Sequence, residues 1–420
     1  MLLLPITFIA TAQTNKPNGS TSSATAVTVP TAYSSSIKLN HVRTRTANAP
    51  ITSLDTFNAR DYTQVKEETQ YFDGLGRPLQ SVARQATPGS SPQDMVSPIV
   101  YDAFGRETYK YIPYVQSGSG VANTDDGRFK LDPFNVQSGF YTGNAELPGM
   151  SGENIFYGKT VYEASPLNRP LKTFAPGNSW AGSEGSGTEH AVSMEYRIND
   201  IYDSVRIWEI AGDSTYCGSG DAGMAVPTTG AAYAAGQLYE NVTIDEHGSR
   251  VVEYKDKEGK VILKKVQIDA SPHNGHTGWL CTYYVYDALA QLRFVIPQKA
   301  VDYLKANSWT FNSDVTSELC FRYRYDARGR MVAKKVPGSG WVYMVNDRRD
   351  RPCFVQDAKM RASNQWMATL YDVLNRPRVT GMVTYAGCRD SLQAYTDRNF
   401  NAASYAAGGV AVRLPPIADP

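Results

Sequence analysis

Short runs in which apolar and polar residues alternate recur along most of this chain. Met331-Val-Ala-Lys-Lys-Val336 is one such run, and it follows directly on a polar, glycine-containing segment. Alternation predicts a half-buried β-strand, and two such runs around a short polar turn predict a β-hairpin. Apolar residues at helical spacing are clear only in Pro297–Ala306, which begins with a proline. The pattern therefore predicts an all-β chain with at most one or two short helices.

The polar turns are copies of one motif: an aromatic residue, aspartate, two variable residues, glycine and a basic residue. Self-similarity of this kind indicates a repeat architecture. The clearest copies are Tyr71-Phe-Asp-Gly-Leu-Gly-Arg77, Tyr101-Asp-Ala-Phe-Gly-Arg106, Tyr254-Lys-Asp-Lys-Glu-Gly-Lys260 and Tyr325-Asp-Ala-Arg-Gly-Arg330. Looser copies are Tyr162–Arg169, Ile244–Arg250, Tyr286–Gln291, Val345–Arg351 and Tyr371–Arg376.

Each part of the motif suits a tight turn. Aspartate can accept hydrogen bonds from backbone N–H groups two residues on, and glycine adopts a positive φ without steric cost. Asparagine tolerates the same geometry at Asn168 and Asn375, and Asp350 is a weaker version. Ala290 breaks the rule, so we expect an altered or strained turn there. The residues assigned to structural repeat turns are Asp73, Gly76, Arg77, Asp102, Gly105, Arg106, Asp256, Gly259, Asp326, Gly329, Arg330, Asp372, Asn375 and Arg376.

The tyrosine and the basic residue of each copy lie on the two strands of the hairpin. The ring and the guanidinium can stack across the hairpin or onto the next one, which would form a ladder along a sheet. A single hairpin cannot bury a face, whereas stacked hairpins build a continuous core. We therefore predict antiparallel hairpins stacked into a curved strip or partial shell.

Composition breaks the chain into segments. The apolar start ends in Ala10-Thr11-Ala12, a pattern typical of signal-peptidase cleavage. The following Ser/Thr/Asn-rich stretch cannot bury enough surface to order itself. The predicted organisation is a signal peptide at 1–12, a disordered tail at 13–40, a β-rich region with hairpins at 41–215, a Gly/Ala-rich linker at 216–236, a β-strip at 237–390 and a flexible end at 391–420.

Charge and cysteine content exclude several classes of function. Lys+Arg 42 against Asp+Glu 41 gives a net charge of +1, so no overall field attracts nucleic acid or an anionic membrane. No run approaches the roughly 20 apolar residues of a spanning helix. The five cysteines are widely spaced and odd in number, which defines neither a zinc site nor a complete disulfide framework.

Candidate chemistry is sparse, and each candidate has a simpler structural interpretation. His273 and His276 form an H-x-x-H pair, but no acidic or cysteine ligands accompany it. Asn123–Gly127 resembles the start of a calcium loop without the later glutamate. The Gly/Ser tracts Gly118–Gly120 and Gly182–Gly187 fit linkers better than phosphate loops.

Two charged clusters also have a structural interpretation. Asp256 and Glu258 lie within a repeat turn, and Arg348, Arg349 and Arg351 are interleaved with acids. The sequence therefore predicts no catalytic residue, cofactor, metal site or nucleic-acid contact.

The recurring Tyr-Asp with its trailing Gly-Arg resembles the bacterial RHS/YD-repeat family over roughly Tyr71 to Val383. The stretches Tyr71–Gln85, Tyr101–Tyr114 and Ala164–Pro170 resemble an N-terminal region of unknown function found in a secreted branch of that family. The resemblance implies a β-strip that spirals into a hollow shell around a C-terminal toxic cargo domain, closed by a core segment that often cleaves itself. No such core segment or cargo is recognisable here, so the resemblance implies no toxin activity for this chain.

The leading hypothesis is a secreted or cell-surface, non-enzymatic structural segment of a shell. Its partners would be a C-terminal effector domain or further RHS repeats. The alternative is an adhesin or glycan-binding module, in which exposed aromatic rings stack on sugars. The tryptophans considered for that role are Trp180, Trp208, Trp279 and Trp341.

Overall fold

The structure is a computed structural model, and it divides into two compact units that we describe separately. The first contains Met1–Glu195 and Thr243–Ser249, and the second Tyr196–Val242 and Arg250–Pro420. The predicted signal peptide, Gly118–Gly120, Asn123–Asp126 and Gly182–Gly187 lie outside the described residues. The described residues are 26–59, 61–88, 92–116, 127–143, 147, 150, 152–181, 189–213, 224–372, 374–398, 404–407 and 410–413.

A five-stranded antiparallel sheet forms the start of the first unit, in the order β1-β2-β3-β4-β6. Side chains alternate between its faces, and along β2 every second residue from Val65 to Tyr71 is buried. Tyr71, Val82, Val96 and Tyr114 form the core of this sheet. The strands are β1 (Asn40–Ala47), β2 (Val65–Phe72), β3 (Pro78–Ala83), β4 (Met95–Pro98) and β6 (Tyr114–Val115).

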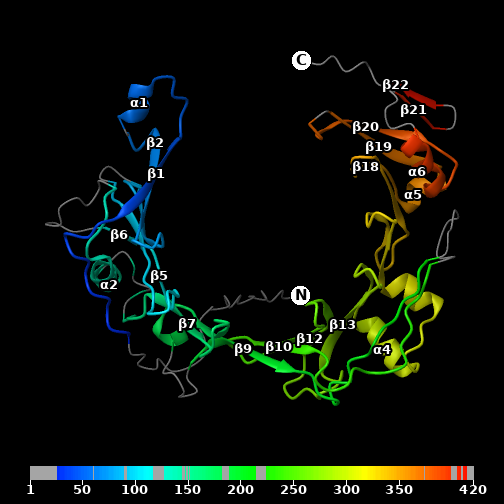
Figure 1. Cartoon of the computed structure of the whole chain (residues 1–420), viewed down its shortest axis with the longest axis horizontal. Coiled ribbons are helices and arrows are strands. Elements are labelled where there is room, and N and C mark those ends of the chain that lie inside the picture. Colours follow the sequence, from blue (N-terminus) through cyan, green and yellow to red (C-terminus); the bar gives the residue numbers. More distant parts are fainter. Residues whose placement is uncertain are drawn as a thin grey trace, which may run out of the picture. The chain divides into compact units, whose positions relative to one another are not determined.

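A second group of strands pairs in the order β5-β7-β8-β9, of which β9 has residues in both units. Helix α2 lies near β5 and β6 (Figure 1). The Gln137 side chain of α2 donates to the carbonyls of Ile112 and Phe156, at 2.7 and 3.0 Å. The elements are β5 (Tyr109–Tyr111), β7 (Tyr157–Tyr162), β8 (Pro170–Phe174), β9 (Ala191–Ile198), α1 (Leu54–Asn58), α2 (Pro133–Gly143) and α3 (Asn178–Ala181).

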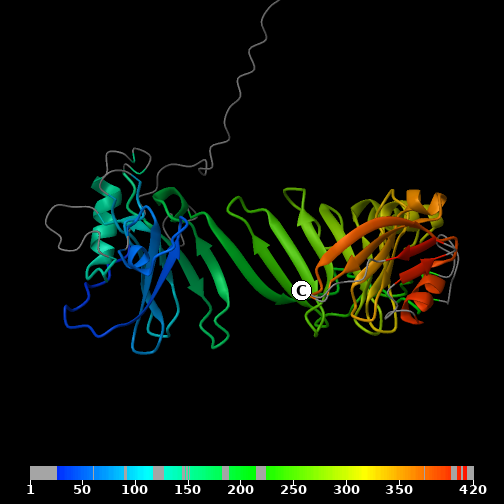
Figure 2. The same ribbon diagram turned by 90° about the horizontal axis from the view of Figure 1, so that it is seen from above.

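The second unit is a ladder of antiparallel strands that follow one another in sequence order from β11 to β20, after β10 (Tyr239–Ile244), which has residues in both units. Figure 2 shows these strands lying side by side along the strip. Their bounds are β11 (Arg250–Lys255), β12 (Val261–Gln267), β13 (Trp279–Tyr286), β14 (Leu292–Ile296), β15 (Phe321–Tyr325), β16 (Met331–Lys335), β17 (Val342–Asn346), β18 (Pro352–Gln356), β19 (Gln365–Tyr371) and β20 (Pro377–Thr384).

Helices α4 and α5 of the second unit lie in connections between consecutive strands, and α6 follows β20. The predicted helix is confirmed: α4 begins at Gln298, directly after the N-cap Pro297. Buried Ala300, Val301 and Leu304 form its packed face. The remaining elements are the π-helical turn η2 (Val315–Leu319), α5 (Ala358–Ala362), α6 (Arg389–Arg398), β21 (Ser404–Ala407) and β22 (Val410–Arg413).

The all-β class with stacked antiparallel hairpins is confirmed. The helices are short, as expected, but they outnumber the one or two that the sequence indicated. Side-chain caps that periodicity does not reveal start two of them: Ser53 accepts from Asp55 N, and Asp357 accepts from Met360 N. No helix in the described part of the chain is long and apolar enough to span a membrane.

Candidate functional site

The repeat turn has one geometry, which the first copy illustrates. The backbone N–H groups of Leu75 and Arg77 donate to Asp73 Oδ1, both at 2.8 Å. Asp73 N and Arg77 O close the hairpin at 2.9 Å, and Gly76 N donates to Asp73 O at 3.1 Å. Gly76 has a φ of +79°. The carboxylate thus spans five residues and satisfies amides that the strand ladder leaves free.

Eight aspartates of the described chain make the same pair of bonds to the amides two and four residues on, at 2.8–3.1 Å. Several of the strand pairs that they join shift register next to the turn, which is the expected mark of a bulged hairpin. The eight are Asp73, Asp102, Asp245, Asp256, Asp287, Asp326, Asp347 and Asp372.

The fourth position of the turn is left-handed whichever residue occupies it. Asn375 and Asp350 have φ values of +64° and +61°, close to those of the glycines. Ala290 also has a φ of +64°, and its N–H still donates to Asp287 O at 2.9 Å. The turn after Asp287 is therefore the same turn, and Ala290 carries the strain, at a typical cost of about 1–2 kcal/mol.

A glutamate replaces the aspartate in the longer turn of Tyr162–Arg169. Both Glu163 carboxylate oxygens accept from Arg169 Nε, at 3.0 and 2.9 Å, and Asn168 supplies the positive φ of +51°. Hydrogen bonds from the Arg169 and Ser165 side chains lower the pKa of Glu163 to about 2.

Where the motif ends in arginine, the side chain folds back onto its own turn. The Nε of Arg77 donates to Asp73 Oδ2 at 2.7 Å, and four other turns repeat the contact at 2.7–2.8 Å. The backbone amide of the arginine is the main cause that lowers the pKa of Asp73 and of Asp372. The four other pairs are Asp102 with Arg106, Asp326 with Arg330, Asp347 with Arg351 and Asp372 with Arg376.

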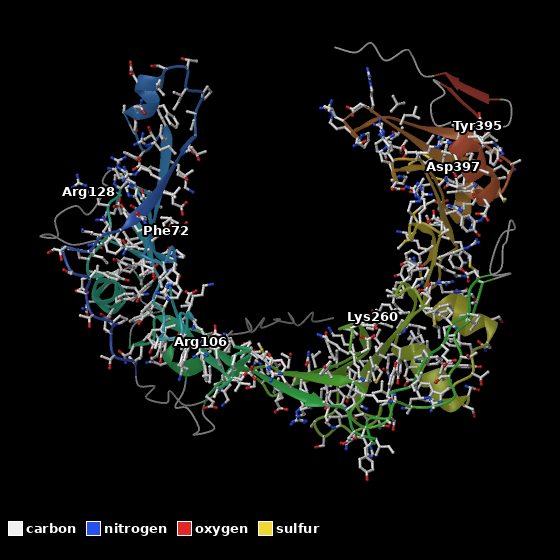
Figure 3. The ribbon with its side chains drawn as sticks, viewed as in Figure 1. Phe72, Arg106, Arg128, Lys260, Tyr395 and Asp397 are labelled. Atoms are coloured by element: carbon white, nitrogen blue, oxygen red, sulfur yellow. The ribbon has the colours of Figure 1, made fainter. Side chains whose placement is uncertain are left out.

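In the first unit the same guanidinium also contacts the next turn. Arg77 lies over the ring of Tyr101, 4.6 Å from the centroid, and Tyr101 donates back to Pro78 O at 2.9 Å. Arg106 (Figure 3) lies over the ring of Tyr162 at 4.9 Å and donates to Asn168 Oδ1 at 3.3 Å. Three turns are thereby linked in series.

The second unit repeats these links. Arg330 donates to the backbone O of Asp347 at 3.0 Å. Arg351 lies 4.6 Å from the centroid of the Tyr371 ring and donates to Asn375 Oδ1 at 2.9 Å. Lys260 (Figure 3) reaches the ring of Tyr286 at 5.9 Å. We call these contacts between successive turns the turn ladder.

In the second unit the turns of the ladder lie along one side of the sheet, at the ends of the strands. Consecutive strands run antiparallel, so every second connection lies at the same edge of the sheet. The turns that begin at Asp256, Asp287, Asp326, Asp347 and Asp372 join alternate strand pairs from β11 to β20. They form a single row, while α4, α5 and the other connections occupy the opposite edge.

The two histidines considered as metal ligands make structural contacts instead. His276 is buried, its Nε2 lies 2.7 Å from the Tyr283 hydroxyl, and burial lowers its pKa to about 3. His273 is exposed and its carbonyl accepts from Trp279 Nε1. No group of three metal-ligating side chains occurs among the described residues.

Charged side chains of the two clusters and the nearby Arg361 make hydrogen bonds or ion pairs within the protein. Lys260 donates to Glu258, and this bond is the main cause that raises the pKa of Lys260. Arg351 pairs with Asp347 at 2.6 Å. Arg361 donates to the carbonyl of Trp341 at 3.0 Å.

The expectation of surface tryptophans is wrong. Trp208, Trp279 and Trp341 are only 9%, 6% and 3% exposed, and Trp180 is partly buried. The Trp208 ring packs against Tyr283, and the Trp341 ring contacts the guanidinium of Arg322.

Three cysteines, Cys281, Cys320 and Cys353, are free and buried. Cys388 is disulfide-bonded. Cys217 lies outside the described residues.

Sequence reasoning missed the buried charges. Asp94 is 0% exposed and its Oδ2 accepts from Lys130 Nζ at 2.7 Å. Lys265 is 1% exposed and its Nζ donates to Asn274 O at 2.8 Å. Lys265 borders a polar cavity of about 150 Å³, and burial lowers its pKa. No local pattern marks these residues, because their partners lie far away along the chain or on an irregular loop.

A family model and several solved structures match different shares of the chain. Residues 43–194 match a family model described as a domain of unknown function, DUF6443. No curated protein matches the chain. Among solved structures, a crystal structure of TcdB2-TccC3 has a TM-score of 0.45 and is 14% identical, covering 76% of this chain and 13% of that one. A Photorhabdus luminescens Tc holotoxin pore with a mutated TccC3 also has a TM-score of 0.45 and 14% identity, covering 76% and 12%. The chain thus spans about an eighth of those chains.

Proposed function

We propose that this chain is a non-enzymatic structural segment of a secreted RHS/YD-repeat protein, and that its strips form part of the wall of a shell around a C-terminal effector. The single observation that carries the proposal is the turn ladder. Eight aspartate turns share one hydrogen-bond pattern, and arginines link successive turns.

A shell wall built from hairpins depends on contacts between neighbouring hairpins, and the turn ladder supplies such contacts. Each hairpin buries one face only by packing on its neighbours, so the stability of such an array is a sum of unit and interface terms. Side-chain contacts between successive turns add to the strand pairing at the turn end of each hairpin. The buried cluster around Trp341, Val345, Phe354 and Trp366 spans several repeats of the second unit in the same way.

Two features support the secreted location. The sequence begins with an apolar run that ends in small residues. Cys388 is disulfide-bonded, and disulfides persist mainly in oxidising compartments outside the cytosol.

The test is to sequence the DNA beyond the codon for Pro420 and to express whatever reading frame is found there with this chain. We expect further Tyr-Asp repeats followed by a distinct C-terminal domain, and a hollow particle by electron cryo-microscopy. A frame without further repeats, or a full-length protein without an internal cavity, would overturn the proposal.

A further inference from the structure

A small polar cavity of about 150 Å³ lies on one face of strands β10 and β11. Side chains two residues apart on a strand point to the same face. Glu240 and Val242 of β10 line the cavity together with Arg250, Val252 and Tyr254 of β11. All of its lining residues belong to the second unit. An engineered cavity of about 150 Å³ binds benzene, so this cavity has room for a ligand of that size.

The floor of the cavity is a hydrogen-bonded network that balances its own charges. Lys265 Nζ donates to Asn274 O at 2.8 Å and to the Tyr254 hydroxyl at 3.3 Å. The Tyr254 hydroxyl in turn donates to Asp203 Oδ1 at 2.8 Å, and Asp203 Oδ2 accepts from Asp200 N at 2.8 Å. The buried cation and the buried carboxylate are thus joined through one hydroxyl, and the floor adds no net charge.

The walls of the cavity are held by hydrogen bonds of their own. On one side, Asp200 Oδ1 accepts from Tyr202 N at 2.6 Å within the turn that follows β9. On the other side, Trp279 Nε1 donates to His273 O at 2.7 Å, and His273 N donates to Thr277 O at 3.1 Å. Walls that are fixed before a ligand arrives cost little conformational entropy on binding.

Two opposite charges at the cavity remain without a partner. Within the described part of the chain, neither the Glu240 carboxylate nor the Arg250 guanidinium makes a hydrogen bond or an ion pair, whereas Arg197, which also lines the cavity, has a partner. Burial is the main cause that raises the pKa of Glu240, and the nearby Asp203 adds to it. A cation beside Glu240 would offset both effects, because it favours the charged form. The guanidinium of Arg250 is exposed and presents the fork of donors that suits a carboxylate.

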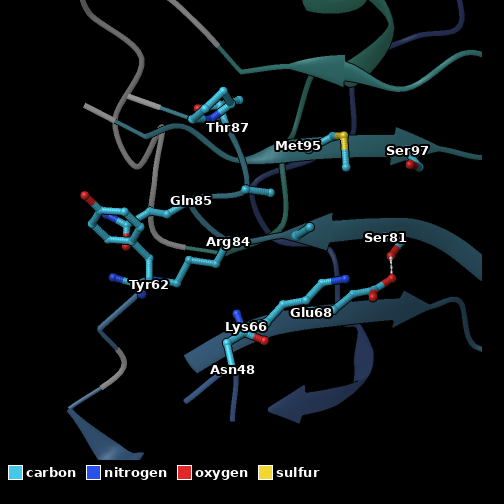
Figure 4. Close-up of a pocket in the computed structure, with 13 residues that line it drawn as sticks. Asn48, Tyr62, Lys66, Glu68, Ser81, Arg84, Gln85, Thr87, Met95 and Ser97 are labelled. Atoms are coloured by element: carbon cyan, nitrogen blue, oxygen red, sulfur yellow. Dashed lines mark hydrogen bonds between the residues drawn. The ribbon is translucent and has the colours of Figure 1, made fainter. Parts of the chain in front are cut away.

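A larger hollow in the first unit offers no such pair of charges. It has a volume of about 540 Å³ and is lined by Tyr62 and by residues of β2, β3 and β4 (Figure 4). Its carboxylate, Glu68, accepts from Ser81 Oγ at 2.8 Å, a bond that Figure 4 draws. Its arginine, Arg84, also has a partner within the protein. The cavity of the second unit is therefore the stronger candidate for a charged ligand.

The two unpaired charges define the class of ligand. A simple cation would leave Arg250 unpaired, a simple anion would leave Glu240 unpaired, and no group of three side chains that could hold a metal ion occurs among the described residues. We propose that this cavity binds a small α-amino acid such as alanine, whose ammonium pairs with Glu240 and whose carboxylate pairs with Arg250. Alanine has as many non-hydrogen atoms as benzene and therefore fits the volume. This inference goes beyond the structural role and does not depend on it.

The direct test is calorimetric titration of the full chain with the D and L forms of alanine, lactate and alaninamide. Lactate keeps the carboxylate and replaces the ammonium by a hydroxyl, and alaninamide keeps the ammonium and replaces the carboxylate by an amide. We expect at least one enantiomer of alanine to bind. The lactate and the alaninamide of the same configuration should each bind about tenfold more weakly, which corresponds to the loss of one charged contact.

Variants assign each end of the ligand to its partner. Glu240→Gln should weaken binding of alanine and alaninamide about tenfold and leave lactate unchanged, because lactate has no ammonium. Arg250→Gln should weaken binding of alanine and lactate about tenfold and leave alaninamide unchanged. The matched controls are Glu318→Gln and Arg348→Gln, which make the same substitutions at exposed residues of the second unit that do not line the cavity. Both should bind as the parent chain does.

Three results would overturn the inference. The first is that neither enantiomer of alanine binds the parent chain. The second is that lactate or alaninamide binds as tightly as alanine, since the ligand would then be a simple anion or a simple cation. The third is that Glu240→Gln or Arg250→Gln, with an unchanged melting temperature, binds alanine as tightly as the parent.

Discussion

The two units share one turn, yet the most deeply buried charged residue is an anion in the first unit and a cation in the second. In the first unit Asp94 and Glu67 are 0% and 1% exposed. Each meets a cation: Lys130 at 2.7 Å and Arg45 at 2.8 Å. In the second unit Lys265 and Arg322 are 1% and 2% exposed and lie against aromatic rings. Asp347, also 2% exposed, pairs with Arg351.

Lys265 and Arg322 illustrate the second solution. Lys265 Nζ lies 4.8 Å from the Tyr254 ring centroid and donates to a backbone carbonyl. The Arg322 guanidinium lies between the rings of Phe294 and Trp341, at 5.2 and 5.1 Å. An ion pair is directional and pins one segment to another, whereas a ring accepts a cation over a broad surface. The Asp94 ion pair therefore positions a loop, whereas the Arg322 guanidinium fills part of the core of its unit.

The largest expected effect comes from removing the buried carboxylate. Asp94→Ala removes the buried carboxylate that accepts from Lys130 and frees the amides of Gln85 and Gly127. We expect a loss of about 3–5 kcal/mol in the free energy of unfolding of the first unit. Hydrogen exchange of the β3 amides measures it. Asp55→Ala, at an exposed site, is the control and should change stability by less than about 0.5 kcal/mol.

A smaller loss is expected when a ring-bound cation is replaced. Arg322→Met keeps much of the buried volume and removes the charge, so the cation–π energy is lost while the desolvation cost disappears. We expect a loss of about 1–2 kcal/mol, measured by hydrogen exchange of the β14 and β15 amides. A loss as large as that of Asp94→Ala would show that the two units do not differ in this respect.

The shared turn can be tested by exchanging residues at its left-handed position. Ala290→Gly should stabilise the second unit by about 1 kcal/mol, because glycine relieves the positive φ. Gly329→Ala should destabilise it by a similar amount. The added Cβ there would meet Gln291 at an ordinary 3.4 Å, so the backbone alone is responsible. Equal thermal unfolding of both variants and the parent would contradict a common turn geometry.

The smallest effect concerns acid stability. The pKa of Glu163 is lowered to about 2 from an ordinary 4.5, so its contribution is fully present above about pH 4.5 and is lost as the pH falls toward 2. Glu163→Gln should make the stability of the first unit less dependent on pH in that window. Thermal melts followed by circular dichroism between pH 5 and pH 2 measure this. An unchanged slope would mean that the Arg169 contact does not persist in solution.

Much of the fold could be predicted from short windows of the sequence. The alternation around each turn indicated antiparallel hairpins. The Asp–Gly spacing matches the bonds that the Asp73 and Asp326 carboxylates accept from the amides four residues on. The helix at Pro297 was predictable because its proline and apolar spacing lie in one short window. Which residues lie side by side on neighbouring strands was not predictable, because it depends on the register that places Ala83 between Glu68 and Met95.

What the sequence by itself determined is therefore the turn. All of its hydrogen bonds close within five residues, so an aspartate, a left-handed residue and a basic residue at fixed spacing suffice to specify it. Tertiary structure alone decided which charges and rings are buried. Asp94 meets Lys130 across 36 residues, and Trp341 meets the guanidinium of Arg322 from another strand. Such contacts depend on which faces pack together, and the spacing of residues along one strand does not encode that choice.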